Sequence, residues 1–341
     1  MRKTISIDFC LNCLSNLPII DVRSPGEYSK GHIPKAISVP LFSDEERAII
    51  GTAYKQGSKE KAIELGYKFV NPKLDSFIKK TLKIAPNKAV VVHCWRGGMR
   101  SNAFATYIEE QGFEKVYIIE GGYKAFRNYV LNFLENPFRL NVLGGYTGSG
   151  KTEILHCLSD KGQQIVDLEG LASHRGSAFG GIDLPEQPSS EQFENNLFTT
   201  IQLLDREKPI WVEDESNAIG RVNIPKQFFT QMRDQKLYFL NISQAERAKH
   251  LVDTYSNLNA DGLAESIIKI TKRLGYNKGK LALEELEKKN YLSVVEIILF
   301  YYDKYYKKGL KKRQTSNIVE LNVDSTNHEK NADFLISTSK I

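Results

Sequence analysis

The feature that most constrains the fold of this chain is a glycine-rich segment, residues 145–152, which reads GYTGSGKT. It fits the pattern G-x-x-x-x-G-K-[ST] and lies between an apolar run (140–143) and a helical pattern (153–158). In such a strand–loop–helix context, glycines let backbone N–H groups converge on phosphate oxygens, and the helix N-terminus adds positive potential. The segment therefore predicts a phosphate-binding loop (P-loop) inside an α/β domain.

The residues of this P-loop have defined expected roles. Lys151 supplies a cation for the outer phosphate, and the Thr152 hydroxyl is placed to bind a magnesium ion. We expect a phosphorylated ligand and no tightly bound cofactor, and the motif does not distinguish ATP or GTP from other phosphorylated compounds. The glycines that form the predicted cradle are Gly145, Gly148 and Gly150.

A P-loop usually works with an acidic residue at the end of a neighbouring strand. An apolar run at 210–212 leads directly into Glu213, Asp214 and Glu215. Spacing does not decide which carboxylate faces a metal ion, and we favour Glu213 and Asp214. Arg175 lies in a loop after another predicted strand and is a candidate phosphate clamp; the alternative is a solvated arginine.

Strand and helix patterns alternate along all 341 residues, which is typical of α/β folds with parallel sheets. Asn136-Pro137 ends a helical pattern, so we predict two domains, 1–137 and 138–341. In the first domain we expect strands at 18–22, 88–92 and 115–119 and helices near 43–49, 57–66, 73–83, 100–111 and 123–135. In the second we expect strands at 139–143, 163–167, 208–213, 236–241 and 317–323 and a long helical region at 260–310.

A second loop contains a candidate catalytic residue. It joins the strand 88–92 to a helix and reads HCWRGGMRS from His93 to Ser101. A cysteine here sits in a cup of backbone N–H groups at a helix N-terminus, beside arginines that favour its thiolate. Cys94 is therefore a candidate nucleophile rather than a packing thiol. The residues expected to form the surrounding oxyanion cup are Arg96, Gly97, Gly98 and Arg100.

Two chemistries use such a cup, and the sequence leaves both open. The spacing HC-x-x-G-x-x-R-S is the signature of cysteine phosphatases. The upstream segments 21–28 (DVRSPGEY) and 31–36 (GHIPKA) instead resemble rhodanese domains, which carry sulfur as a cysteine persulfide, although dual-specificity phosphatases share them. Five residues separate Cys94 from Arg100, and this wider loop suits a tetrahedral oxyanion or a larger chalcogen better than plain thiosulfate transfer.

The composition indicates in which cellular environment the protein works. No apolar run approaches the roughly 18 residues that a membrane span needs, and no signal peptide is expected. Four cysteines in so long a chain do not make a disulfide framework, so we expect a reducing, cytoplasmic environment. Residues 1–137 hold 20 Lys and Arg against 14 Asp and Glu, an excess compatible with a polyanionic partner.

A segment near the C-terminal end interleaves aromatic and basic side chains. This pattern suits stacking on unpaired bases while the cations contact backbone phosphates. An amphipathic helix with a solvated lysine face is the alternative. The candidate nucleic-acid-binding residues are Tyr301, Tyr302, Lys307, Lys308, Lys311, Lys312 and Arg313.

The two loops in one chain, together with several local motifs, resemble the bacterial tRNA 2-selenouridine synthase family, in which a rhodanese-like domain is fused to a P-loop domain. The resemblance keeps the order of its parts over nearly the whole chain. The matching segments are 94–101, 120–124, 144–152, 167–180, 212–216 and 301–303.

The resemblance implies a transferase whose substrate is tRNA with 2-thiouridine at the wobble position. It implies two co-substrates, geranyl diphosphate, which alkylates the sulfur, and selenophosphate, which delivers selenium in place of the geranylthio group. We expect the P-loop to hold the diphosphate and Cys94 to serve the selenium step. No membrane partner is expected.

Two rival hypotheses follow from the same residues. One is a cysteine phosphatase or generic sulfurtransferase fused to a P-loop kinase, and the other is a non-catalytic tRNA-binding module. The intact residues Cys94, Lys151 and Thr152 speak against the second hypothesis.

Overall fold

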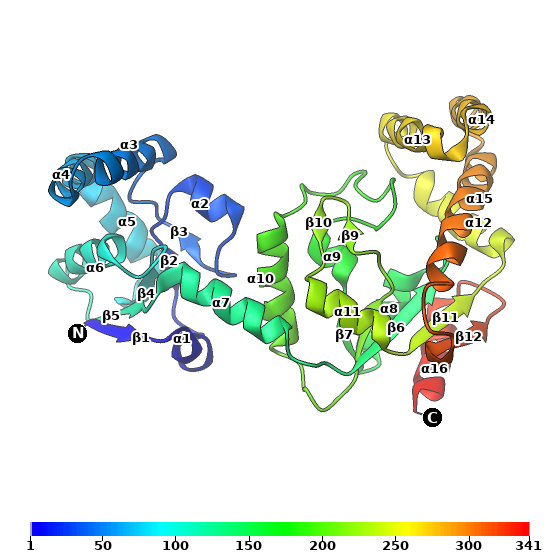
Figure 1. Ribbon diagram of the computed structural model, residues 1–341, viewed down its shortest axis with the longest axis horizontal. Coiled ribbons are helices and arrows are strands. Elements are labelled where there is room, and N and C mark those ends of the chain that lie inside the picture. Colours follow the sequence, from blue (N-terminus) through cyan, green and yellow to red (C-terminus); the bar gives the residue numbers. More distant parts are fainter. Residues whose placement is uncertain (1, 341) are drawn as a thin grey trace. The chain divides into compact units, whose positions relative to one another are not determined.

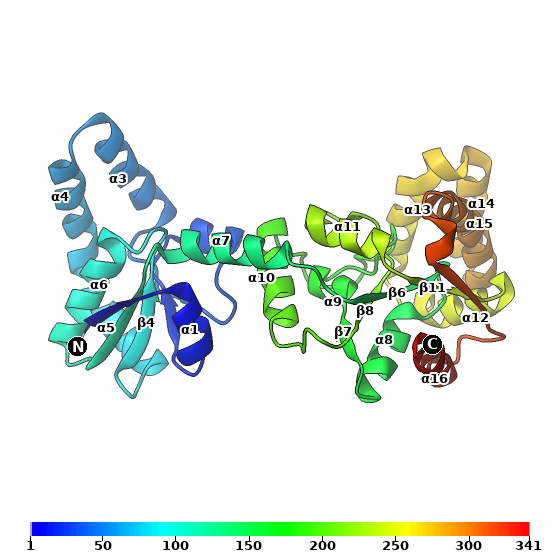
Figure 2. The ribbon, with the colours of Figure 1, turned by 60° about the horizontal axis from the view of Figure 1, so that its bottom comes forward.

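The computed structural model describes residues 2–340, and the chain divides into two compact units after Phe133 (Figures 1 and 2). The division falls at the end of helix α7 (Gly122–Leu134), a few residues before Pro137, where the sequence analysis places the boundary. Each unit contains one five-stranded sheet whose paired strands all run parallel. The predicted α/β class is confirmed.

In the first unit the strand order is β1-β5-β4-β2-β3. β2 (Ile19–Asp21), β4 (Ala89–His93) and β5 (Lys115–Ile119) confirm the three predicted strands. β1 (Arg2–Ile5) and β3 (Ile37–Ser38) were not predicted. Both are edge strands, β3 has only two residues, and β1 has only one buried residue, so neither gives a clear apolar pattern.

The helices of the first unit match the predicted ones closely, with two short additions near the N-terminus. Serine N-caps start several of them; Ser43, for example, forms a capping box with Glu46. Cys10 is buried and Cys13 is exposed on the first helix, as expected of a helix face. The helices are α1 (Ile7–Cys13), α2 (Pro25–Lys30), α3 (Asp44–Gln56), α4 (Lys59–Val70), α5 (Leu74–Ile84), α6 (Met99–Glu110) and α7.

The second unit has the strand order β12-β11-β6-β8-β7. The P-loop leaves the central strand β6, and β8 is its direct neighbour, with Leu143 paired to Glu213. The acidic segment after β8 therefore lies beside the P-loop, as predicted. The strands are β6 (Leu140–Gly145), β7 (Gln164–Val166), β8 (Ile210–Glu213), β11 (Leu237–Asn241) and β12 (Ile318–Asn322), with a separate hairpin of β9 (Ala218–Ile219) and β10 (Val222–Asn223).

The predicted helical region at 260–310 is three helices with a core of their own, drawn yellow to orange in Figure 1. Gly275 (φ +101°) and Lys289 (φ +57°) lie at the breaks between these helices.

Among residues 2–340, none of the helices combines the length and the apolar character that crossing a bilayer demands. The three helices at 260–310 are α13 (Ala260–Leu274), α14 (Tyr276–Glu287) and α15 (Tyr291–Leu310); the others are α8 (Lys151–Asp160), α9 (Leu168–Ala172), α10 (Ser190–Ile201), α11 (Lys226–Asp234), α12 (Gln244–Tyr255) and α16 (His328–Ser339).

Candidate functional site

The P-loop has the backbone geometry that a phosphate cradle needs. Gly148 (φ +83°) and Gly150 (φ +70°) both adopt the left-handed conformation that favours glycine. A Cβ atom at Gly148 would lie 2.8 Å from the Leu251 side chain, and one at Gly150 would lie 2.8 Å from His328. Any larger residue at either position would therefore distort the loop. Gly145, the third predicted cradle residue, is buried at the end of β6.

Lys151 and Thr152 open helix α8 and face the same cavity. Burial opposes the charge on Lys151, but the neighbouring oxygens of Tyr306, Glu215 and Glu169 outweigh it and raise the pKa of the ammonium. The Lys151 Nζ lies 3.5 Å from the Tyr306 hydroxyl. Thr152 donates its hydroxyl proton to Glu169 at 2.8 Å. The cavity thus presents a permanent cation beside a carboxylate.

Glu169 and Glu215 form a buried carboxyl pair next to these residues. A Cβ atom on Gly176 would lie 2.5 Å from Glu169 Oε1 and 2.7 Å from Glu215 Oε2, so the two carboxyl groups meet at one point. Burial, together with the charge of Glu169, raises the pKa of Glu215 to about 8. The pair therefore shares a proton at neutral pH. With the Thr152 hydroxyl, these carboxyl groups supply the oxygen ligands that Mg²⁺ prefers.

The two acids favoured by the sequence analysis make other contacts, although Asp214 also lines the P-loop cavity. Glu213 is fully buried and accepts a hydrogen bond from the Glu169 N–H at 2.8 Å, and burial raises its pKa well above the ordinary value. Asp214 accepts from Arg313 at 2.5 Å and from Arg233 at 3.3 Å. Glu215 and Glu169 are the acids whose charges act on Lys151. Sequence reasoning did not favour these two acids, and the assignment of a metal ion to Glu213 and Asp214 stays a prediction.

Arg313 is also placed differently from the prediction. Its side chain is buried, pairs with Asp214 and donates to the carbonyl oxygens of Met232 and Arg233. It cannot offer its charge to a tRNA phosphate, and its assignment as a tRNA contact is wrong.

The other members of the basic–aromatic segment divide into buried and exposed residues. Tyr301 packs in the core of the helical region, and the half-buried Tyr302 accepts a hydrogen bond from the Ala178 N–H at 2.9 Å. These tyrosines fasten the helical region rather than offering free rings for base stacking, which corrects that part of the prediction. Lys307, Lys308, Lys311 and Lys312 are exposed, as the tRNA hypothesis requires.

A cavity of about 460 Å³ extends from the P-loop toward the helical region. One end is polar, with the P-loop, Glu169 and Glu215. Arg175, the predicted phosphate clamp, also lines it. The rest of the wall is largely aromatic and aliphatic. The residues of this wall come from three separate stretches of chain, so no local sequence pattern predicts them: Phe179, Leu251, Tyr255, Leu258, Tyr302, Tyr305 and Leu310.

Arg247 ties the helical region to the P-loop. It is buried, and its guanidinium donates to the Thr147 carbonyl at 3.0 Å and to both carboxylate oxygens of Asp303 at 2.8 and 2.9 Å. The same group lies over the Tyr146 ring, 4.9 Å from its centroid. Asp303 belongs to a segment that carried the family resemblance, but no role could be read from the sequence.

In the first unit Cys94 follows β4 directly and is buried. Its Sγ lies 3.4 Å from the Ser101 hydroxyl. Burial opposes ionisation, but the Ser101 hydrogen bond, the Arg100 charge and the Arg96 backbone N–H outweigh it and lower the pKa of the thiol. This environment favours the thiolate that a nucleophilic cysteine needs.

Two arginines were predicted to form the cup around Cys94. The Arg100 side chain is half-buried, whereas that of Arg96 is exposed. Arg100 donates two hydrogen bonds to Glu27, at 2.7 and 3.3 Å. Although burial acts in the opposite direction, these contacts lower the pKa of Glu27 to about 2. Glu27 orients the arginine beside Cys94. It lies in the DVRSPGEY segment, which the sequence analysis noticed without assigning a role to this residue.

A glycine pair supports the cysteine loop from behind. Gly97, one of the predicted cup glycines, has φ +64°, and Gly122 has φ +57°. A Cβ atom at Gly122 would lie 2.3 Å from the Cys94 carbonyl oxygen, so only glycine fits. The N–H groups of Tyr123 and Lys124 donate to the Cys94 and Trp95 carbonyls, both at 2.9 Å. The segment 120–124 therefore fixes the loop backbone.

Comparisons with known proteins match both units. A family model for the tRNA 2-selenouridine synthase AAA domain matches residues 138–331, and a rhodanese-like domain model matches residues 11–129. Curated relatives cover most of the chain. A tRNA 2-selenouridine synthase of Sulfurovum sp. is 36% identical, with 88% of this chain and 91% of the relative covered. Those of Bdellovibrio bacteriovorus (34%; 88% and 91% covered) and Nitrosomonas europaea (30%; 89% and 91% covered) are similar over the same extent.

Proposed function

The chain belongs to the tRNA 2-selenouridine synthase family, and from this premise we propose that it acts on wobble 2-thiouridine of tRNA in two steps. In the first step the thiocarbonyl sulfur is alkylated by geranyl diphosphate. In the second, selenophosphate supplies selenium, and the geranylthio group leaves. Alkylation converts the sulfur into a better leaving group, which explains why an alkylation would precede the exchange.

The observation that carries the proposal is the two-ended cavity of the second unit. Its polar end offers the P-loop N–H groups and Lys151 to a diphosphate, while its apolar wall offers Leu251, Leu258 and Phe179 to a ten-carbon chain. The volume of about 460 Å³ lies in the usual range for small-molecule sites. A prenyl diphosphate has the same division into a charged head and an apolar chain.

In the alkylation step the tRNA sulfur attacks C1 of the geranyl group, the C1–O bond breaks, and diphosphate leaves with the electron pair. Lys151 and the N-terminus of α8 stabilise the negative charge that develops on the leaving group. No protein nucleophile is needed. The Glu169–Glu215 pair with Thr152 could coordinate a magnesium ion that shares this task.

For the selenium step we propose the cysteine loop of the first unit. Its lowered thiol pKa and the Arg100 guanidinium suit Cys94 to a cup that holds and orients selenophosphate. The selenium of selenophosphate attacks C2 of the base, the C–S bond breaks, and geranylthiolate leaves with the electron pair. Water then cleaves the Se–P bond, which releases phosphate and leaves 2-selenouridine.

Nucleoside mass spectrometry of 2-thiouridine tRNA, after incubation with the enzyme, geranyl diphosphate and selenophosphate, tests the whole proposal. We expect S-geranyl-2-thiouridine first and 2-selenouridine later. Failure to form either nucleoside would refute the proposal. Release of phosphate from a chromogenic ester, lost in Cys94→Ser, would instead support the phosphatase hypothesis.

The prenyl assignment has its own test. Leu258→Asp places a charge on the apolar wall, so we expect geranyl diphosphate to bind about tenfold more weakly or worse. Inorganic diphosphate, which lacks the chain, should bind with unchanged affinity. An unchanged Kd for geranyl diphosphate would place the prenyl chain elsewhere.

A further inference from the structure

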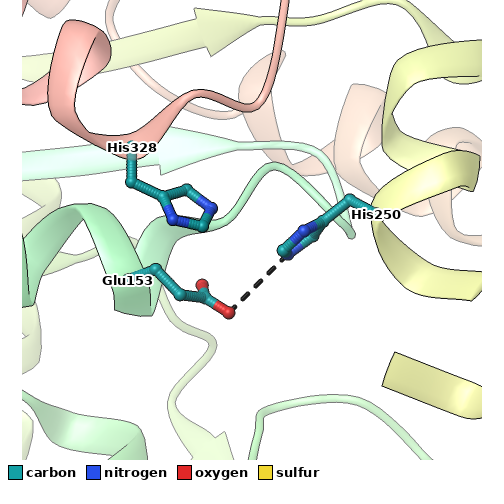
Figure 3. A group of neighbouring side chains, drawn as sticks. All are labelled: Glu153, His250 and His328. Atoms are coloured by element: carbon teal, nitrogen blue, oxygen red, sulfur yellow. Dashed lines mark ion pairs between the residues drawn. The ribbon is translucent and has the colours of Figure 1, made fainter. Parts of the chain in front are cut away.

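Three side chains from distant parts of the second unit converge beside the P-loop (Figure 3). Glu153 lies in the first turn of α8, His250 in α12 and His328 at the start of α16. One ligand atom from each lies within 4.8 Å of the other two. Glu153 Oε1 and His250 Nε2 are 3.6 Å apart.

The ion pair between Glu153 and His250 leaves the Nε2 atom of His328 without a hydrogen-bond partner among residues 2–340. This Nε2 atom is buried. A buried polar atom without a partner is costly, and an ion or an ordered water is a common explanation. The ring lies directly against the P-loop, because its Nε2 would be 2.8 Å from a Cβ atom at Gly150.

We propose that Glu153, His250 and His328 bind a divalent transition-metal ion of the zinc type. Two imidazoles and one carboxylate are a donor set that suits Zn²⁺ and related ions better than Mg²⁺ or Ca²⁺, which prefer oxygen ligands alone. Metal–ligand bonds of about 2.0–2.1 Å place tetrahedral ligands about 3.3 Å apart. The Glu153–His250 separation of 3.6 Å is close to this value, and the ligand atom of His328 lies within 4.8 Å of both.

The position of the cluster gives the ion a role beyond the proposed chemistry of Thr152, Glu169 and Glu215. Glu153 and His250 both line the cavity, whereas His328 lies beside Gly150 and is not one of the lining residues. Three protein ligands leave one coordination position for a water or a ligand oxygen at the polar end. The ion would also link α8, α12 and α16 around the P-loop.

Cobalt titration of the metal-free full-length protein tests this site, because four-coordinate Co²⁺ gives a characteristic visible absorption. We expect one equivalent to bind, without the sulfur-to-cobalt charge-transfer band that cysteine ligands produce. Zinc should displace the cobalt and raise the Tm of the protein. Dialysis with elemental analysis provides an independent measure of zinc stoichiometry.

His328→Gln should weaken cobalt and zinc binding at least tenfold and abolish the zinc-dependent rise in Tm. The matched control is His156→Gln, which removes an exposed imidazole from the same helix α8 and should bind as the wild type does. If His328→Gln does not fold, as judged by circular dichroism, Glu153→Gln serves in its place. Wild-type protein without a bound equivalent, a cobalt spectrum with thiolate bands, or unchanged affinity in the folded variant would each overturn the proposal.

Discussion

At the scale of single residues, the two loops give Cys94 and Lys151 different chemical properties. The cysteine combines a lowered thiol pKa with a neighbouring guanidinium, whereas Lys151 is a permanent cation at a helix N-terminus. Cys94 belongs to the core of the first unit, and Lys151 lines the cavity of the second. Because the two residues lie in separate units, each can be removed without disturbing the other.

Cys94→Ser should accumulate geranylated tRNA and form little 2-selenouridine, because serine is scarcely ionised at neutral pH. Lys151→Ala should stall before geranylation, since losing a charge-assisted contact weakens diphosphate binding by about 1.5–3 kcal/mol. A time course of both nucleosides for each variant provides the measurement. Selenation at the wild-type rate by Cys94→Ser would show that the cysteine loop is structural.

Arg100→Gln should shift the pH profile of Cys94 alkylation by iodoacetamide upward by about one pH unit. An opposite charge within a few ångströms lowers a thiol pKa, so its removal raises that pKa again. Arg96→Gln is the matched control, because its side chain is exposed and its backbone N–H remains in place. Equal profiles for Arg100→Gln and wild type would mean that backbone groups alone set the thiol pKa.

At the scale of elements, α15 has one side toward the P-loop and another toward solvent. Tyr306 contacts Lys151, whereas Lys307 and Lys308 are exposed, and Lys311 and Lys312 follow directly after the helix. The exposed lysines are the part of the predicted tRNA surface that the structure leaves available.

Replacing these four lysines with glutamine should weaken tRNA binding and flatten its salt dependence. Each lost phosphate contact should remove about 0.7–0.9 from the slope of log K against log salt. Arg313→Gln provides the contrast. It breaks a buried ion pair, so it should lower the free energy of unfolding by roughly 3–5 kcal/mol and leave the slope unchanged. A slope that the lysine variant does not alter would place the tRNA surface elsewhere.

Elements with strong local patterns were predictable, and long-range pairings were not. The P-loop and the cysteine loop each carry a motif between a strand and a helix, and both lie where that context predicts. The choice among Glu213, Asp214 and Glu215 depends on which way the chain turns after β8, which spacing does not encode. The burial of Arg313 depends on Asp214, 99 residues earlier in the chain.

At the scale of the whole molecule, the chain consists of two units that each have a parallel sheet and a buried core. The core of the first unit is continuous from the strands to α5 and α6, and the second unit has separate clusters for its sheet and its helical region.

We therefore expect residues 134–341, expressed alone, to unfold cooperatively and to geranylate 2-thiouridine tRNA without forming 2-selenouridine. Circular dichroism melting and nucleoside mass spectrometry provide the two measurements. The same fragment with Lys151→Ala is the negative control. A folded fragment that forms no geranylated tRNA would assign part of the alkylation to the first unit.

The Arg247 bridge has a thermodynamic consequence. It joins the P-loop carbonyl of Thr147 to Asp303 on α15, the helix that also bears Lys307 and Lys308. A diphosphate that reorders the P-loop and a tRNA that engages α15 would then act on one connected element. Thermodynamic linkage makes such an effect reciprocal. If bound diphosphate raises the affinity for tRNA by some factor, bound tRNA raises the affinity for the diphosphate by the same factor. The enzyme would therefore hold its alkyl donor most firmly when the nucleic acid that consumes it is already bound.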